Sequence, residues 1–457
     1  MSYIGSNPVT QSFIAGTDYF SGTGSQTAFT LSRSVVSVND IQATVNNVVQ
    51  VPNDAYTVSG TTITFTSAPS AGTNNVYVRY LSTTTQAITP SQGTVSWNTL
   101  DSNIQQDLGL MGKNKIINGN MVIDQRYAGA ATANTISGYT LDRWNAVQTT
   151  TGKLIVQQNA GSVTPPAGFT NYLGVTSQSA YSIGAGDFYA VLQSIEGYNL
   201  ADLNWGTANA KTVTLSFWVR SSLTGTFGLC LNNGGTRSYP FTYTISSANT
   251  WEQKSITVAG DQSGTWNATN GTGVQIWFGL GVGSTNAGPV GAWASANYVG
   301  VSSAVSVVGT NGATFYLTGV QLEVGTQATT FTTAGGSYGA ELALCQRYFY
   351  KHASGGSGSN DNIIGSMWYY TSSFALTYIK FPTTMRTNPT AVATSGTDYF
   401  SVFRNGTGDS FNSLTLNTSS PTGVELYNDG QISGTAGQTG GLVGQSSLMY
   451  LGFSAEL

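Results

Sequence analysis

The sequence is poor in charged residues. Asp, Glu, Lys and Arg together make up 8% of the 457 residues, where about 25% is usual. The 16 basic and 20 acidic residues are spread thinly, and no Lys/Arg run offers the electrostatic contact that a nucleic-acid backbone requires. We therefore expect no nucleic-acid partner. A surface made of Thr, Ser, Asn and Gln instead suits a neutral partner such as a sugar.

Cysteine and histidine are also scarce, with two and one residues. Cys230 and Cys345 lie far apart and match no metal or redox spacing, so we expect two buried free thiols. The single histidine, His352, excludes most Ser/His/Asp and Cys/His catalytic schemes. Its place beside Lys351, before a Gly/Ser-rich stretch, indicates a solvated loop residue. We assign no cofactor and no metal site.

Long apolar runs are absent from the sequence. No segment approaches the roughly 18 apolar residues that a membrane span needs. The N-terminal stretch MSYIGSNPVTQSF (1–13) has neither the basic nor the apolar region of a signal peptide. We expect a protein that is made in a cytoplasm, does not insert into a membrane and reaches its destination by another route, of which virion assembly is one.

Glycine, tyrosine and strand-like patterns are abundant instead. The chain has 56 Gly, 24 Tyr and 11% aromatic residues, unlike disordered chains, which are charged and aromatic-poor. Its length allows about three domains at roughly 150 residues each. Runs that alternate apolar and polar residues recur between turn signals, with hardly any helical pattern. This organisation predicts an all-β, multi-domain fold.

A small antiparallel β-domain is predicted over residues 1–85. Its strand-like runs are 28–31, 42–51, 56–60, 61–66 and 75–81. Ser59-Gly60 separates two of these runs and indicates a tight turn.

Residues 86–112 are predicted to form a linker followed by a short helix. The Thr/Ser/Gln-rich start is typical of a linker. Apolar residues spaced by three and four then predict a helical stripe, made of Trp97, Leu100, Ile104, Leu108 and Met111. A lone helix of about twelve residues is marginal in water. The stripe must therefore pack on its own chain or on the same helix of sister chains.

Two further β-domains are expected, over residues 113–335 and 336–457. In the first, strand-like runs predict a two-sheet, jelly-roll-like β-sandwich; they are 152–158, 187–195, 213–221, 225–231, 253–260, 274–282 and 314–324. In the second, 341–351 is either a short helix or the start of a strand, and the strand-like runs are 366–381, 424–433 and 448–457. Asn428-Asp429-Gly430 predicts a hairpin turn.

Several stretches resemble parts of bacteriophage tail proteins. A domain common in phage and prophage tail proteins is similar to NKIINGNMVIDQR (114–126) with YTLDRWNA (139–146), to residues 237–266 and to ATFYLTGVQLEVGTQATTF (313–331). The distal domain that often follows it resembles ELALCQRYFYK (341–351), FPTTMRTNPT (381–390) and the terminal SAEL. Residues 28–81 are similar to the virion-proximal modules of tail fibres.

The resemblance implies a homotrimeric tail fibre. Its N-terminal domain would dock on a tail or adaptor protein, while the distal part contacts the host. The central sandwich would be like a carbohydrate-binding module, and the stripe from Trp97 to Met111 would be a trimeric helical neck. We therefore expect a structural receptor-binding protein of the virion tail, made in the host cytoplasm, that attaches to a host-surface polysaccharide.

Two alternatives remain open. The first is a tailspike enzyme that cleaves polysaccharide, which needs two carboxylates about 5 to 9.5 Å apart. Its candidates are Asp187, Glu196, Asp202, Glu252, Asp261 and Glu323. The repeat of a parallel β-helix, the usual fold of phage depolymerases, is absent from the sequence, and we expect no enzymatic activity. The second alternative is a purely structural tail component that binds another virion protein.

Aromatic residues beside polar ones are the candidates for sugar binding, because an aromatic ring stacks on a sugar ring while neighbouring amides reach its hydroxyls. In the central domain they are Trp205, Trp266, Trp293 and Tyr298. Trp218 and Trp277 lie inside strand-like runs and are expected in the core. In the distal domain the consecutive Trp368, Tyr369 and Tyr370 must alternate between two faces of a strand, so at least one points outward. We expect one or two of these aromatics to contact glycan.

Overall fold

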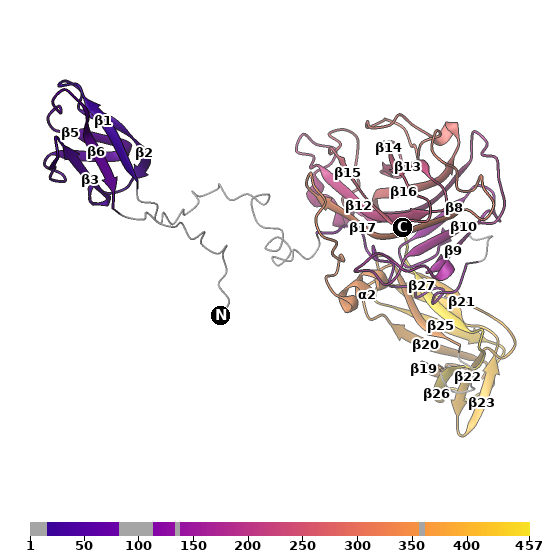
Figure 1. The fold of residues 1–457 in the computed structure, drawn as a ribbon. Helices are drawn as coiled ribbons and strands as arrows, with labels where there is room; N and C mark the ends of the chain where they lie inside the picture. The colour runs from indigo at the N-terminus through magenta and orange to yellow at the C-terminus, as the bar shows by residue number, and fades with distance from the viewer. Residues whose placement is uncertain (1–15, 82–112, 133–137, 356–361) are drawn as a thin grey trace. The chain divides into compact units, whose positions relative to one another are not determined.

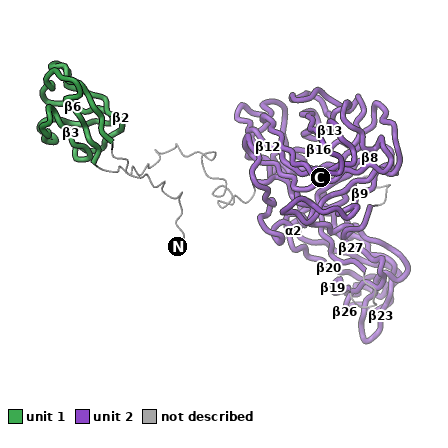
Figure 2. Tube along the Cα trace, viewed as in Figure 1, with its two compact units in different colours: residues 1–100 green, residues 101–457 purple. Residues whose placement is uncertain are grey.

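The computed structural model describes residues 16–81, 113–132, 138–355 and 362–457. The chain divides into two compact units, residues 1–100 and 101–457 (Figure 2). Within the described residues, one α-helix, α2 (Tyr338–Gln346), and several short 3-10 turns accompany many strands (Figure 1). The predicted all-β, multi-domain fold is confirmed. The neck stripe from Trp97 to Met111 lies outside the described residues.

The N-terminal unit has its own small β-fold. Four strands form a sheet in the order β1-β6-β3-β4, and β2 pairs with β5. Their bounds are β1 Thr17–Gly22, β2 Ala28–Val35, β3 Ile41–Val45, β4 Val48–Val49, β5 Tyr56–Phe65 and β6 Gly72–Tyr80. Period-two alternation turns one face of each strand inward, so Phe29, Ile63 and Val76 are buried together in one core.

Two turns in this unit differ from the prediction. Ser59-Gly60 is not a turn, because β5 runs through both residues. Gly60 lies at φ +59°, where the pairing of β5 with β2 shifts register. The run 42–51 is not one strand but a hairpin of β3 and β4. Asn46 and Asn47 form its turn at φ +49° and +64°, a left-handed conformation that Asn tolerates better than most residues.

Residues 113–335 contain a two-sheet antiparallel β-sandwich, and the strand pairings described within each sheet are antiparallel. The sheets have the orders β15-β12-β17-β10-β9 and β14-β13-β16-β11-β8-β7. The bounds are β7 Gly138–Tyr139, β8 Asn145–Gln148, β9 Leu154–Gln158, β10 Leu173–Ser177, β11 Phe188–Glu196, β12 Val213–Ser221, β13 Gly225–Asn232, β14 Ser238–Ile245, β15 Glu252–Val258, β16 Thr272–Val282 and β17 Thr314–Val324. Every predicted run in this segment is a strand.

The sandwich core lies between the two sheets. Phe217 and Phe315 of one sheet pack with Phe278 of the other, and the rings of Phe217 and Phe278 are 5.1 Å apart and nearly perpendicular. Cys230 and Cys345 are both buried and free, as predicted. Burial raises the pKa of each thiol, so both thiols are inert.

The distal residues add α2, a seven-stranded sheet and a three-stranded sheet. The sheets have the orders β23-β22-β26-β19-β20-β25-β24 and β18-β27-β21. The bounds are β18 Phe349–Ser354, β19 Asn362–Tyr369, β20 Phe374–Lys380, β21 Thr390–Ala393, β22 Phe400–Arg404, β23 Thr407–Phe411, β24 Thr415–Ser420, β25 Gly423–Asp429, β26 Thr439–Gly444 and β27 Tyr450–Ser454.

The structure refines one distal prediction and contradicts another. Segment 341–351 is both a helix and a strand, since α2 ends at Gln346 and β18 begins at Phe349. The predicted hairpin turn at Asn428-Asp429-Gly430 is wrong. β25 pairs with β20 and β24, whereas the strand that follows, β26, pairs with β19 and β22. The turn residues therefore lead into a longer connection.

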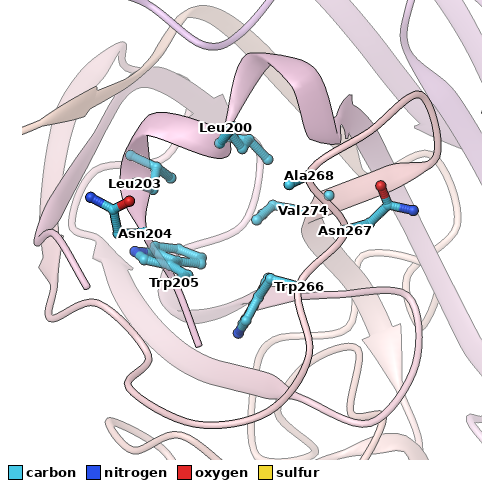
Figure 3. A pocket seen from close by; sticks show the side chains of 10 residues that line it. Leu200, Leu203, Asn204, Trp205, Trp266, Asn267, Ala268 and Val274 are labelled. Atoms are coloured by element: carbon cyan, nitrogen blue, oxygen red, sulfur yellow. The ribbon is translucent and has the colours of Figure 1, made fainter. Parts of the chain in front are cut away.

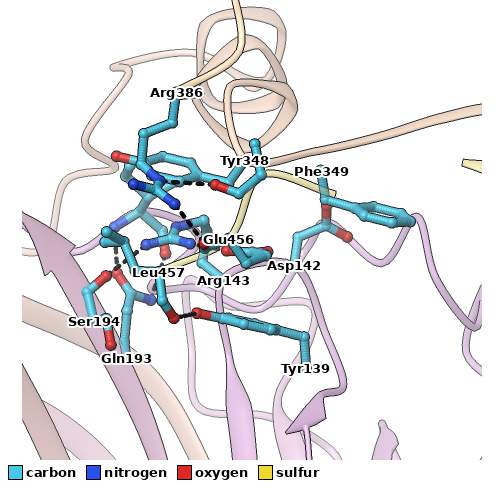
Figure 4. Close-up of polar contacts among 12 residues, drawn as sticks. Tyr139, Asp142, Arg143, Gln193, Ser194, Tyr348, Phe349, Arg386, Glu456 and Leu457 are labelled. Carbon is cyan, nitrogen blue, oxygen red and sulfur yellow. Dashed lines mark hydrogen bonds and ion pairs between the residues drawn. The ribbon is translucent and has the colours of Figure 1, made fainter. Parts of the chain in front are cut away.

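A buried ionic cluster connects the distal strands to the sandwich (Figure 4). Glu456 accepts a hydrogen bond from Arg126 at 3.0 Å and pairs with Arg143 through its other oxygen. Arg143 is 1% exposed and Glu456 is 6% exposed. The Arg143 guanidinium also lies 3.5 Å from the ring centroid of Tyr348. A charge buried this deeply is tolerated only when an opposite charge is paired with it. The pairing of Glu456 with Arg126 and Arg143 therefore holds the distal part against the sandwich.

A second ion pair supports the same connection. Arg347, which follows α2, donates to both carboxylate oxygens of Glu196 at 2.8 and 2.6 Å, and the Tyr348 hydroxyl donates to Glu196 at 2.5 Å. Burial acts to raise the pKa of Glu196, but these hydrogen bonds outweigh it and lower that pKa. Residues 113–335 and 336–457 thus belong to one compact unit, while their boundary near residue 335 stays a prediction.

The buried Asp142 makes the stability of this unit pH-dependent. Burial raises the pKa of Asp142 to about 7, although Gln125 donates two hydrogen bonds to it. The unfolded carboxyl ionises near pH 3.9, so the folded state alone holds the proton between about pH 4 and 7. The free energy of unfolding should therefore fall as pH rises through this window, by on the order of 4 kcal/mol from this group.

The substitution Asp142→Asn isolates this contribution. Urea unfolding at pH 4.5, 6 and 8 should show a smaller decline for the variant than for the parent chain, because the variant keeps every other titrating group. Equal pH slopes in the two proteins would show that Asp142 does not hold a proton in the folded state.

Candidate functional site

Three of the predicted aromatic residues meet at one end of the sandwich. Trp205 follows β11, Trp266 lies between β15 and β16, and Trp293 follows β16. The ring centroids are 4.8 Å apart for Trp205 and Trp266, 5.3 Å for Trp205 and Trp293, and 5.4 Å for Trp266 and Trp293, and each pair is nearly perpendicular. Trp205 is 8% exposed, whereas Trp266 and Trp293 are half-buried and partly accessible. We call these three residues the tryptophan cluster.

Hydrogen bonds hold each indole of the tryptophan cluster. Trp205 Nε1 donates to the carbonyl of Lys211 at 2.8 Å, and Trp293 Nε1 donates to the carbonyl of Ala259 at 2.8 Å. Trp266 Nε1 donates to the carbonyl of Ser263 at 3.2 Å. Because the rings are fixed before any ligand arrives, binding would cost little side-chain entropy.

A buried ion pair ties the surrounding loops together. Arg237, just before β14, donates to both oxygens of Asp261 at 2.6 Å, and its third nitrogen donates to Ser295 at 2.8 Å. The bidentate geometry is the strongest arrangement for such a pair. The positive charge of Arg237 thereby balances the negative charge of Asp261, and the loops that carry Trp266 and Trp293 are held together.

Gly206 allows two of the loops to approach closely. It lies at φ +84°, and a Cβ atom there would meet the carbonyl oxygen of Gly264 at 2.7 Å. Only glycine combines this left-handed conformation with so short an approach. The contact brings the loop of Trp205 against the loop of Trp266.

A small hollow opens beside Trp205 and Trp266 (Figure 3). Its volume is about 50 Å³. Apolar side chains and tryptophan rings line most of it, and none of the lining residues is charged; they are Leu200, Ala201, Leu203, Asn204, Trp205, Trp266, Asn267, Ala268, Gly273 and Val274. Asn204, Asn267 and Ala268 are exposed, and the two asparagine side chains lie on opposite sides of the hollow and point away from it (Figure 3).

The other aromatic residues of the sandwich that were considered from sequence, Tyr298, Trp277 and Trp218, lie outside the tryptophan cluster. Tyr298 packs against Gly288, whose Cβ, if present, would lie 2.1 Å from the tyrosine ring, and among the described residues it has no ring contact with the tryptophan cluster. Its backbone N–H donates to Ser238, which fastens its loop to β14. Trp277 is 8% exposed, as expected of a core residue. The same expectation is wrong for Trp218, which is half-buried because it lies on the face of β12 opposite to the buried Phe217 and Val219.

The distal aromatic residues alternate in burial along the end of β19 and the residue that follows it, Tyr370. Trp368 is half-buried, Tyr369 is 1% exposed and Tyr370 is 68% exposed. The Tyr369 hydroxyl donates to Asp409 at 2.6 Å, and Arg404 covers its ring at 4.7 Å. Tyr369 therefore offers no ring face to a sugar, and its inclusion among the binding candidates is not supported. Tyr370 is the outward-pointing residue that alternation predicts.

The six carboxylates considered for catalysis all have hydrogen-bonded or ionic partners. Glu196 and Asp261 are held by Arg347 and Arg237 as described above. For the others the partners are Tyr181 for Asp187, Lys115 for Asp202, Lys254 for Glu252 and Lys113 for Glu323. In no case does another of the six provide the contact.

His352 was predicted as a solvated loop residue, and this prediction is wrong. It lies in β18 and is half-buried. One ring nitrogen is 3.1 Å from the Tyr350 hydroxyl and the other is 2.7 Å from the carbonyl oxygen of Ile364. The Gly/Ser-rich stretch that suggested a loop begins only after the strand.

Other residues of the site were not predicted from sequence. The two asparagines beside the hollow are adjacent in sequence to the tryptophans, as Asn204-Trp205 and Trp266-Asn267, and this adjacency was the available signal. Leu200, Leu203 and Val274 resemble ordinary core residues, and nothing in their pattern indicates a hollow.

In the described part of the chain, no helix has the length and apolar character that a membrane crossing requires.

No protein-family model matches the sequence, and no curated protein matches it at a significant level. Solved structures show likenesses of low TM-score. The enzymatically active domain of tailspike protein 4 of bacteriophage CBA120 matches with TM-score 0.24 and 12% identity, over 46% of this chain and 21% of that one. This chain thus spans about a fifth of the length of that tailspike domain.

Carbohydrate-binding modules give comparable values. A family 11 module from Clostridium thermocellum, in complex with a mixed-linked tetrasaccharide, matches with TM-score 0.21 and 12% identity, over 43% of this chain and 96% of the module. A xylan-binding domain from Paenibacillus barcinonensis matches with TM-score 0.20 and 12% identity, over 44% of this chain and 99% of the domain. Likenesses at these TM-scores assign neither a function nor a ligand to this chain.

Proposed function

We propose that this chain is a tail fibre protein of a bacteriophage and that its central sandwich binds a polysaccharide of the bacterial surface. The observation that carries the binding proposal is the tryptophan cluster, in which the partly accessible indoles of Trp266 and Trp293 pack on the buried Trp205, on loops joined by the Arg237–Asp261 ion pair. Ligand sites of this kind combine aromatic walls with a few placed polar groups. The resemblance of residues 114–146, 237–266 and 313–351 to phage tail proteins supports the virion role.

The proposal gives each part of the chain a role. The N-terminal unit docks on a tail or adaptor protein, and three chains assemble into one fibre. A single shallow site holds sugar weakly; a millimolar site provides roughly 4 kcal/mol. Linking several such sites can raise avidity by about 10² to 10⁴ without new contacts. Trimerisation therefore compensates for the weakness of each site.

We also propose that the polysaccharide is bound and not cleaved. All six candidate carboxylates are engaged with partners other than one another, whereas glycoside hydrolysis needs two carboxylates on either side of the same bond.

Mixing the purified chain with bacterial surface polysaccharides tests binding and cleavage together. Size-exclusion chromatography with light scattering should show a protein of about three times 47.8 kDa that shifts to larger mass with a bound polysaccharide. The amount of reducing ends should stay constant over hours. A rise in reducing ends with shrinking polysaccharide would establish a depolymerase, and a chain that elutes as a monomer would contradict the trimer.

A further inference from the structure

The seven-stranded distal sheet has one face in the distal core and one face open to solvent. Along β20, Ala375 and Ile379 point into the core, so Phe374, Leu376 and Tyr378 point to the opposite side. The open face of an antiparallel sheet normally carries polar side chains. Here it carries large rings, and Tyr378 is 55% exposed.

Strand pairing places these rings beside one another. Leu376 pairs with Trp368 of β19 and with Tyr427 of β25. The ring of Phe374 is 5.2 Å from that of Tyr427 and 6.2 Å from that of Tyr370, which follows β19. With Phe403 of β22, six aromatic residues share this side of the sheet. We call them the aromatic face: Trp368, Tyr370, Phe374, Tyr378, Phe403 and Tyr427.

The aromatic face is broad in two directions. Phe403 belongs to it because its partner Gly441 on β26 also pairs with Ser366, which points to the same side of β19 as Trp368. The strand order β22-β26-β19-β20-β25 gives a width of about 19 Å, and Phe374 and Tyr378 are about 14 Å apart along β20. Such a patch fits the broad surface of a protein better than a single polysaccharide strand.

The exposed area of the aromatic face matches the apolar part of a protein interface. Tyr370, Tyr378 and Phe403 are 68%, 55% and 36% exposed, and the other three rings are half-buried. At about 200 Å² for a fully exposed aromatic residue, the six residues expose roughly 450 Å². This is about the apolar share of the roughly 800 Å² that each partner buries in a standard interface.

Charged residues stay at the border of the aromatic face. Pairing puts Lys380, Glu425 and Asp429 on this side of the sheet. Lys380 and Asp429 stand at the two ends of the pairing between β20 and β25, and Glu425 lies on β25, which bounds the face. Clustered Tyr, Trp and Phe with charges kept to the rim are the composition of an interface between proteins.

We propose that the aromatic face is a subunit interface, at which the distal sheets of sister chains pack on one another in the fibre. Around a threefold axis each chain turns the same face inward, so the rings of three chains leave water together. This inference rests on the proposed trimer and adds a surface that holds it. Glycan binding at the tryptophan cluster does not depend on it.

Hydroxyl-radical labelling of the full chain, followed by peptide mass spectrometry, compares Tyr378 with Tyr338. The two are 55% and 61% exposed on the single chain, but Tyr338 begins α2 and lies outside the sheet. In the assembled protein Tyr378 should be labelled about tenfold more slowly than Tyr338, because the centre of an interface excludes water.

The alternatives give different labelling results. Equal rates in a chain that light scattering shows to be trimeric would overturn the inference and leave the trimer. A monomer would overturn both, while glycan binding stands or falls by its own test. Equal rates that change to protection of Tyr378 only after polysaccharide is added would assign the aromatic face to glycan and overturn the subunit interface.

Tyr378→Asp puts a charge into the aromatic face, and Tyr338→Asp is the matched control. Light scattering at increasing urea measures the urea concentration at which the trimer separates. Tyr378→Asp should lower this concentration, and Tyr338→Asp should leave it unchanged. Unchanged tryptophan fluorescence without urea would show that both variants fold. Separation of both variants at the same urea concentration as the parent chain would contradict the interface.

Discussion

Replacing Trp266 with alanine is expected to weaken binding of the surface glycan by tenfold or more. Trp266 is half-buried, borders the hollow and offers the accessible ring of the tryptophan cluster. The C–H face of a sugar packs on such a ring, and losing roughly 60 Å² of apolar contact costs about 1.5 kcal/mol, which corresponds to about tenfold in affinity. Since a single site is weak, this loss should take monovalent binding below detection.

Trp251→Ala is the matched control for this substitution. Trp251 is also half-buried and also donates its indole N–H to a backbone carbonyl, that of Thr164 at 2.9 Å, but it packs on Tyr172 away from the tryptophan cluster. It should leave glycan affinity unchanged. Trp266→Phe retains an aromatic face and should lose less affinity than Trp266→Ala. Calorimetric titration with a bound polysaccharide measures all three variants, and equal losses for Trp251→Ala and Trp266→Ala would remove the cluster from the binding site.

The largest expected effect on stability comes from Glu456→Ala. This substitution leaves Arg143, 1% exposed, and Arg126, 12% exposed, without their shared carboxylate. Removing one partner of a buried ion pair typically costs about 3–5 kcal/mol, because the other charge stays buried and unpaired. The distal strands should therefore separate from the sandwich at lower urea concentration than in the parent chain.

Asp202→Ala is the control for this loss. Asp202 pairs with Lys115 at 3.0 Å, but its side chain is 48% exposed, and exposed pairs contribute at most about 1 kcal/mol. Urea unfolding of both variants, followed by tryptophan fluorescence, should show a much larger loss for Glu456→Ala. Similar losses for the two variants would mean that the buried cluster does not connect the distal part to the sandwich.

Much of the fold could be predicted from the sequence, because the alternation of apolar and polar residues along a strand is a local property. The runs that became β12, β16 and β17 were predicted nearly residue for residue, since a strand buried on one face or both carries its pattern within about ten residues. Turns were less readable. Ser59-Gly60 looked like a turn but lies within β5, because glycine also serves where the pairing of two strands shifts register.

The contacts that connect the sandwich to the distal part could not be predicted from the sequence. Glu456 and Arg143 are 313 residues apart in sequence, and each alone looks like any surface charge. Only the fold shows that both are buried. The prediction for His352 was wrong for a related reason. The polar residues after it suggested a loop, but the histidine lies within β18, at the point where the pairing of β18 with β27 shifts register.

The candidate site was predicted in part. The reasoning that polar neighbours mark accessible aromatics selected Trp205, Trp266 and Trp293, and the structure brings these three together. It could not show that they meet, since they come from three separate loops that only the sandwich brings to one end. The same reasoning could not rank Tyr369 against Tyr370, because strand phase decides which side chain is buried.

Attachment to intact bacteria tests the central claim most directly. The fluorescently labelled chain is incubated with a panel of bacteria that carry different surface polysaccharides, before and after periodate oxidation of the sugars or protease treatment of the cells. Saturable binding to at least one strain, lost after periodate and retained after protease, is the predicted result. Binding that survives periodate but is lost after protease would contradict a polysaccharide receptor and place recognition on a surface protein instead.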